Sequence, residues 1–241
     1  ASLILTRMAV SSRLHIAVWC VVAMLLYYFS TPPIVHCQRD TWMLLPCAAA
    51  LMLRMGQLTQ RKSTTACFRW QAVAEGALWG LGVWIKPYVI LIAIACWASS
   101  LRLRNSKGTQ LLRCSLWEVA SLLIGGISAG LFGFALLYVT GSASHFFETM
   151  SEWSGDYLEN GALAKLRFSS WTSFLLYGSP WSLLHLLAIP LAIYALIARR
   201  RAAREVAKPT LVAEKLLAVF YLIWTVQAFC VQLPHPYVLA P

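Results

Sequence analysis

Three charged side chains stand inside or at the edge of apolar runs, where ionisable groups are costly. Lys86 is the only basic residue of the apolar run 71–100, and Pro87 follows it directly. Arg39 and Asp40 belong to the stretch HCQRDTWM, which leads into another apolar run. A lysine at a helix N-terminus can bind a phosphate, because its charge adds to the positive end of the helix dipole. Arg39 can supply a second phosphate contact. Asp40 can act as a base, a metal ligand or a hydrogen-bond acceptor for a hydroxyl group.

Each of these side chains also has an explanation that involves no chemistry. The long aliphatic stem of Lys86 can extend through the apolar region until the ammonium group reaches the lipid headgroups. Arg39 and Asp40 can form an ordinary ion pair at the surface. The residue types alone leave both explanations open.

The stretch QLPHPYVLAP at the end of the sequence offers weaker candidates. Gln232, His235 and Tyr237 are polar or amphipathic side chains that can line a substrate pocket. Aromatic residues also collect at membrane interfaces without any further purpose. These three residues therefore stay secondary to Lys86, Arg39 and Asp40.

The composition indicates the elements that carry these residues. The 241 residues are 59% hydrophobic and 12% charged, with a mean hydropathy of +0.65, which is too apolar for a soluble domain with one core. Short polar pieces separate the apolar runs, as in bundled helices and unlike the alternating strands of a barrel. We predict an all-α fold, a polytopic membrane helix bundle that forms a single transmembrane domain over residues 1–241 among membrane lipids.

The charges and cysteines exclude several other classes of protein. The net charge is +11, but most of the 20 Lys and Arg residues lie in clusters between apolar runs, where positive charge sets membrane topology. We therefore expect no nucleic-acid partner. The seven cysteines include no CxxC pair, which predicts small core residues and no disulfide framework, zinc site or other metal site.

The basic clusters also predict how the chain crosses the membrane. The predicted spans cover residues 14–30, 41–55, 71–100, 116–140, 181–198 and 216–231. If the run 71–100 crossed once, the clusters around Arg61 and Lys107 would lie on opposite sides, against the positive-inside bias. A helical hairpin that turns at Lys86-Pro87 places every basic cluster in the cytoplasm and Lys86 at the outer tip.

Some conspicuous residues are assigned to packing. Glu75 and Glu118 lie near the inner ends of spans, so we expect them to form packing contacts or interfacial ion pairs. Gly126 and Gly130 have GxxxG spacing, which predicts a close helix-packing face. The outer loop 141–179 is expected to lie as an amphipathic segment on the membrane.

Three stretches together resemble the polyprenyl-phosphate-sugar glycosyltransferases of the GT-C fold, near the protein O-mannosyltransferase and aminoarabinose-transferase branch. They are QRDTWMLLPCAAALMLR, EGALWGLGVWIKPYVILIAIACW and CVQLPHPYVLAP. The second, a glycine-rich helix that runs into Lys-Pro and back, is the most specific. The resemblance covers much of residues 14–241 by pattern and not by extended identity.

The resemblance implies an enzyme that transfers one sugar from a polyprenyl-phosphate donor to an acceptor hydroxyl on the non-cytoplasmic side, here of the bacterial inner membrane. Lys86 and Arg39 would contact the departing phosphate, Asp40 would occupy the family's second acidic position, and the cofactor is unknown. The principal catalytic carboxylate of the family lies in an upstream outer loop, and no residue here corresponds to it. Because the sequence begins at Ala1 without a methionine, we expect it to be part of a longer protein.

Two other classes of function remain open from the sequence. In a transporter or flippase for a lipid-linked or anionic substrate, Lys86 and Arg39 would line a path, and a second set of broken helices would be expected. In a non-catalytic membrane subunit, Lys86, Arg39 and Asp40 would not converge.

Overall fold

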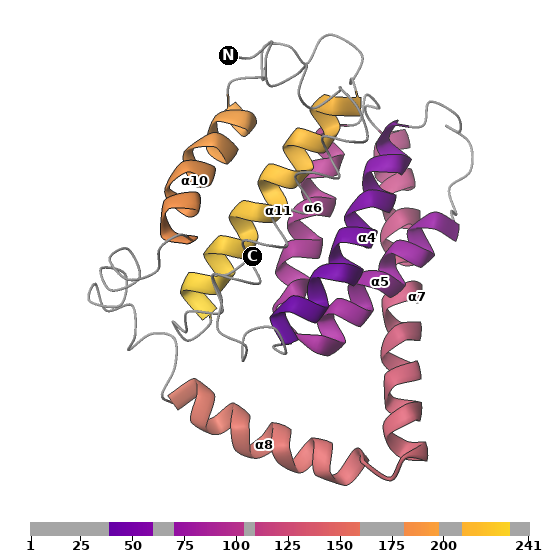
Figure 1. Ribbon diagram of the computed structural model, residues 1–241. Helices are drawn as coiled ribbons and strands as arrows, with labels where there is room; N and C mark the ends of the chain where they lie inside the picture. Colours follow the sequence, from indigo (N-terminus) through magenta and orange to yellow (C-terminus); the bar gives the residue numbers. More distant parts are fainter. Residues whose placement is uncertain (1–38, 60–69, 104–108, 160–180, 198–208, 232–241) are drawn as a thin grey trace, which may run out of the picture.

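The computed structural model describes residues 39–59, 70–103, 109–159, 181–197 and 209–231 (Figure 1). These ranges form seven α-helices and no strand, which confirms the all-α class for the described part of the chain. The helices are α4 (Arg39–Thr59), α5 (Trp70–Ile85), α6 (Val89–Leu103), α7 (Thr109–Val139), α8 (Ala143–Glu159), α10 (Trp181–Ile197) and α11 (Pro209–Val231). The predicted span 14–30 lies outside the described residues.

Two of these helices are long and apolar enough to cross a membrane. The qualifying segments are Leu112–Val139 in α7 and Leu211–Ala228 in α11. Large apolar side chains of α7, among them Leu131 and Phe132, are exposed on the protein surface, as expected for side chains in contact with lipid. Length and composition therefore indicate an association with membrane.

The apolar run 71–100 is not one helix, because α5 ends at Ile85 and α6 begins at Val89. Arg54 of α4 contacts Glu75 near the start of α5 and Ser100 near the end of α6. A single side chain can reach both positions only if the two helices run in opposite directions. The chain thus folds back at the predicted Lys86-Pro87 position, and α4 and α6 end where α5 and α7 begin (Figure 1).

The core of the bundle is formed by α4, α5, α6 and α11. Its fully buried apolar side chains include Met43, Cys47, Ile92, Cys96 and Leu216. Cys47 and Cys96 are free thiols, so the prediction of small core cysteines is confirmed at these two positions. The shared core fixes the relative positions of the helix ends that carry the candidate chemistry.

Helices α5 and α7 make the most extensive contact in the described chain, and glycines bring their backbones together. A Cβ atom on Gly76 would overlap the Leu122 carbonyl, and one on Gly80 would lie 2.9 Å from the Gly126 Cα. The prediction of close packing is correct for Gly126 and wrong for Gly130, where an added Cβ meets nothing within 4 Å. The pair that forms the interface on α5 is Gly76 and Gly80, which also have GxxxG spacing.

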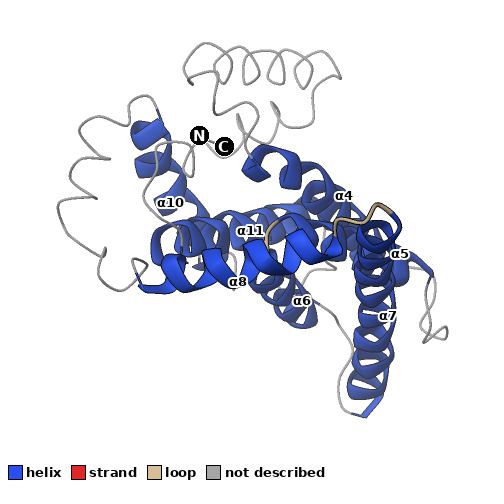
Figure 2. Cartoon of the chain, turned by 90° about the horizontal axis from the view of Figure 1, so that it is seen from below, coloured by secondary structure: helices blue, strands red, loops and turns tan. Residues whose placement is uncertain are grey.

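The predicted outer loop 141–179 begins with a helix. α7 ends in a turn at Gly141, whose φ of 70° favours glycine, and the Ser142 amide donates to the Leu137 carbonyl at 2.9 Å. This turn sends α8 sideways, so that α8 crosses the end of the bundle at which α4 and α6 begin (Figures 1 and 2).

Candidate functional site

The turn that carries Lys86 is closed by its own backbone. The Lys86 amide still donates to the Gly82 carbonyl at 2.8 Å, as in a continuing helix. The amides of Val89, Ile90 and Leu91 then donate to the carbonyls of residues 86, 87 and 88. These three amides are therefore occupied, so an anion at this turn would interact with the Lys86 ammonium and the helix dipole and would not be held by a fork of free amides.

The start of α4 lies beside this turn. A Cβ on Gly82 would lie 3.1 Å from Cys47 Sγ, so α4 and α5 are in contact at this level. One turn further along each antiparallel helix, Met43 comes level with Lys86. The first residues of α4 follow about 5 Å beyond that level, at 1.5 Å of rise per residue.

Arg39 and Asp40 are the first two residues of α4. The backbone thus brings the start of α4, with Arg39 and Asp40, and the Lys-Pro turn to the same end of the bundle (Figure 1). An acidic side chain in the first turn of a helix is electrostatically favourable, as is an anion bound there. The third candidate group, Gln232, His235 and Tyr237, lies outside the described residues and directly follows the end of α11 at Val231.

Aromatic side chains fix the surroundings of the turn. Trp84, two residues before Lys86, stacks on Phe146 of α8 with ring centroids 5.7 Å apart and an interplanar angle of 12°. Its indole also meets Phe134 of α7 edge to face at 5.0 Å. Phe147 continues the cluster by stacking on Phe134 at 6.0 Å. This aromatic cluster joins the beginning of α8 to α5 and α7 beside the lysine.

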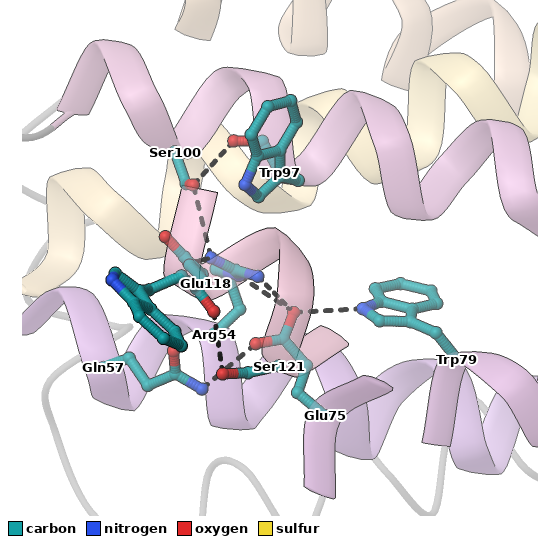
Figure 3. Close-up of polar contacts among 9 residues, drawn as sticks. Arg54, Gln57, Glu75, Trp79, Trp97, Ser100, Glu118 and Ser121 are labelled. Carbon is teal, nitrogen blue, oxygen red and sulfur yellow. Dashed lines mark hydrogen bonds and ion pairs between the residues drawn. The ribbon is translucent and has the colours of Figure 1, made fainter. Parts of the chain in front are cut away.

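The opposite end of the bundle holds a buried ionic network (Figure 3). Arg54 has none of its surface exposed, and Glu75 has 1% exposed. Glu75 accepts hydrogen bonds from Arg54 Nε at 2.9 Å, Gln57 Nε2 at 3.1 Å and Trp79 Nε1 at 3.0 Å. Arg54 also forms an ion pair with Glu118 of α7.

The guanidinium group of Arg54, which belongs to α4, contacts side chains of three other helices. Arg54 Nη1 reaches Ser100 Oγ of α6 at 3.4 Å, in addition to Glu75 of α5 and Glu118 of α7. The expectation that Glu75 and Glu118 form packing or ion-pair contacts is correct. Arg54 belongs by sequence to the basic cluster around Arg61, which is expected as a whole in the cytoplasm, but its guanidinium is buried between helices.

A sequence signal for the buried position of Arg54 does exist. The buried residues Met43, Cys47 and Ala50 recur at helical spacing along α4, and Arg54 continues the same face. Glu75 likewise belongs to the face of α5 that buries Ala72 and Trp79. A charged residue on a buried helix face requires a charged or polar partner. The buried residues Arg54, Glu75 and Glu118 lie in adjacent helices and can supply one another with such partners.

Comparisons with protein-family models, curated proteins and solved structures found no match for this chain. Within the described helices, no group of three or more His, Cys, Asp and Glu side chains is arranged to hold a metal ion. At the end of the bundle that carries the Lys86 turn, helices α4 and α6 begin and the aromatic cluster of Trp84, Phe134, Phe146 and Phe147 lies nearby. This arrangement suits an anionic group attached to an apolar chain.

Proposed function

We propose that this chain is the polytopic transmembrane part of a glycosyltransferase of the bacterial inner membrane, which moves a sugar from a polyprenyl-phosphate carrier to an acceptor hydroxyl on the non-cytoplasmic side. The observation that supports this proposal best is the fold-back at Lys86, which puts a cation beside the start of α4 with Arg39 and Asp40. A lipid phosphate needs cations at the membrane surface and apolar helices for its chain.

The proposed topology places the Lys86 turn slightly below the outer membrane surface. α5 has 16 residues and α6 has 15, so each is about 22–24 Å long at 1.5 Å per residue. A hydrocarbon core is about 30 Å thick. The turn then lies within the outer leaflet, and the buried network of Arg54 lies towards the cytoplasmic side. The long side chain of lysine can bridge the remaining few ångströms to the phosphate of a polyprenyl carrier in the same leaflet.

The proposed reaction is a displacement at the anomeric carbon of the sugar. The bond between that carbon and the phosphate oxygen breaks, the acceptor oxygen forms the new bond, and the hydroxyl proton leaves with a base. Lys86 and Arg39 stabilise the charge that develops on the departing phosphate. The acceptor hydroxyl donates a hydrogen bond to Asp40, which takes up the proton as the base while the transition state has oxocarbenium character.

Replacement of Lys86 tests the proposal. In the full-length protein, Lys86→Ala is expected to lower sugar transfer from a polyprenyl-phosphate donor by about 10²–10³-fold, the usual loss when one group that stabilises developing negative charge is removed. Expression and melting temperature should stay near those of the unchanged protein. Lys215→Ala, at the opposite end of the bundle in α11, is the matched control and should retain full turnover. Unchanged turnover in Lys86→Ala would overturn the assignment.

The buried network of Arg54, Glu75 and Glu118 supports a second candidate function. Charged side chains between membrane helices are common on transport paths, so a transporter or flippase for a lipid-linked substrate is the alternative. Reconstituted vesicles separate the two candidates. A transporter moves the labelled lipid between leaflets without an acceptor and leaves the sugar–phosphate bond intact, whereas the glycosyltransferase breaks that bond only when an acceptor is present.

A further inference from the structure

Gln227 of α11 is a buried polar residue with no assigned role. It has 1% of its surface exposed, and neither Nε2 nor Oε1 has a hydrogen-bond partner in the described part of the chain. A buried amide without partners is destabilising, and such groups are rare in folded proteins. Its neighbour Thr225 is different, because Thr225 Oγ1 donates to the Tyr221 carbonyl of its own helix at 2.8 Å.

Gln227 lies on the face of α11 that contacts the bundle core. Val212, Leu216, Phe220 and Ile223 pack into that core and recur at helical spacing. Gln227 follows Ile223 by four residues and therefore continues the same face. An ordinary core position here would carry an apolar side chain, as the preceding turns do.

The position along α11 places Gln227 near the candidate site. α11 packs against α6 and α4, and its last turns lie towards the end of the bundle at which both of these helices begin (Figure 1). Gln227 is in the last turns of α11, four residues before its end at Val231. Gln227 thus lies in the part of α11 that is towards the end of the bundle carrying the Lys86 turn and the start of α4.

We infer that Gln227 binds a hydroxyl group of the sugar on the lipid carrier, an inference that rests on the proposed glycosyltransferase function. The amide presents two N–H donors and one carbonyl acceptor, and all of them lack partners. A sugar hydroxyl donates and accepts at once, so it satisfies both ends of the amide. An ionised phosphate only accepts hydrogen bonds and leaves the carbonyl oxygen unsatisfied. Lys86 therefore holds the phosphate, and Gln227 recognises the sugar.

Binding to the full-length protein in nanodiscs tests this division of roles. One probe is polyprenyl monophosphate without a sugar. The other is a sugar-bearing polyprenyl phosphate, chosen as the one that binds tightest among those carrying mannose, glucose or 4-amino-arabinose. Gln227→Met replaces the amide by an apolar side chain of nearly the same length. It is expected to weaken binding of the sugar-bearing lipid by about 10–100-fold, the cost of one good hydrogen-bonding group, and to leave binding of the bare lipid phosphate unchanged.

Control variants separate this inference from the proposed function. Lys86→Ala should weaken binding of both lipids, and Thr225→Val should change neither. Gln227→Leu is measured beside Gln227→Met, and both should melt no lower than the unchanged protein, because they remove an unsatisfied buried amide. If both Gln227 variants keep the preference for the sugar-bearing lipid, or weaken both lipids equally, the inference fails while the proposed function stands. If the unchanged protein binds none of the probes, the proposed function itself fails.

Discussion

The two ends of the helix bundle use charged residues in different ways. At one end, Arg54 is buried between Glu75 and Glu118, and its hydrogen bonds and ion pairs join four helices. At the other end, Lys86 lies in a turn between α5 and α6, close to the start of α4. The buried charges of Arg54, Glu75 and Glu118 contact one another across helices, whereas Lys86 lies in the turn that connects two helices.

The same contrast appears in the contact between α5 and α7. Near the ionic network, a Cβ on Gly125 would overlap the Val73 carbonyl, so backbone touches backbone. Near the turn, the atoms nearest to a Cβ on Gly133 would belong to the indole ring of Trp84, at 2.6 Å. In the contact between α5 and α7, backbone thus packs against backbone near the network, whereas a side chain lies between the helices near the turn.

The largest effect is expected from breaking the ionic network. Arg54→Met leaves two carboxylates buried without their shared guanidinium, which typically costs about 3–5 kcal/mol in the free energy of unfolding. The variant should lose most of its folded yield, and its melting temperature in nanodiscs should fall sharply.

A triple variant checks that the unpaired charge, and not the change in side-chain volume, causes the loss of stability in Arg54→Met. Arg54→Met combined with Glu75→Gln and Glu118→Gln removes the buried charges and keeps one acceptor oxygen at position 75, for Trp79 Nε1. It should recover most of the lost stability, since replacing a whole buried ionic group is often neutral and the Gln57 amide can turn over to present its oxygen to the new NH2 group. A single Arg54→Met variant as stable as the unchanged protein would show that the network does not hold this end.

An intermediate effect is expected at the close contact of α5 with α7. Gly125→Ala places a methyl group against the backbone at Val73 and Ala77, and forcing the helices apart typically costs about 1–3 kcal/mol in unfolding free energy. Gly130→Ala is the matched control, because its new methyl group meets nothing within 4 Å. Thermal unfolding of the two variants should therefore differ clearly, and equal melting temperatures would contradict this account of the interface.

Much of the fold was predictable from composition and charge. Apolar runs predicted the helices α4, α7, α10 and α11, and the bias of positive charges predicted the fold-back at Lys86-Pro87. These features depend on the average hydrophobicity of a segment and on the charges at its ends, and both can be read from the sequence without knowing which helices are neighbours. Helix α8 was not predicted, because its polar residues have no long apolar run to mark them as a helix.

Side-chain partners were harder to predict, because they depend on which helices are neighbours. Arg54 belongs by sequence to a basic cluster, and only the packing of α4 against α5 and α7 shows that it faces two glutamates. Gln227 looks like an ordinary polar residue near a helix end, and its missing partners become visible only in the folded chain. The roles of Lys86, Arg39 and Asp40 remain predictions.

The smallest effect is expected at the turn, where Gly133→Ala tests whether side chains hold this end. The added methyl group displaces the Trp84 indole, which can move, so the cost in global unfolding free energy should stay below that of Gly125→Ala, at about 1 kcal/mol or less. The local effect should be larger than the global one, because Trp84 stacks on Phe146 and anchors the start of α8. Hydrogen exchange should become faster at the amides of α8 and stay unchanged around Arg54. A uniform increase along the whole bundle would mean that the two ends unfold together and that the contrast between them does not exist.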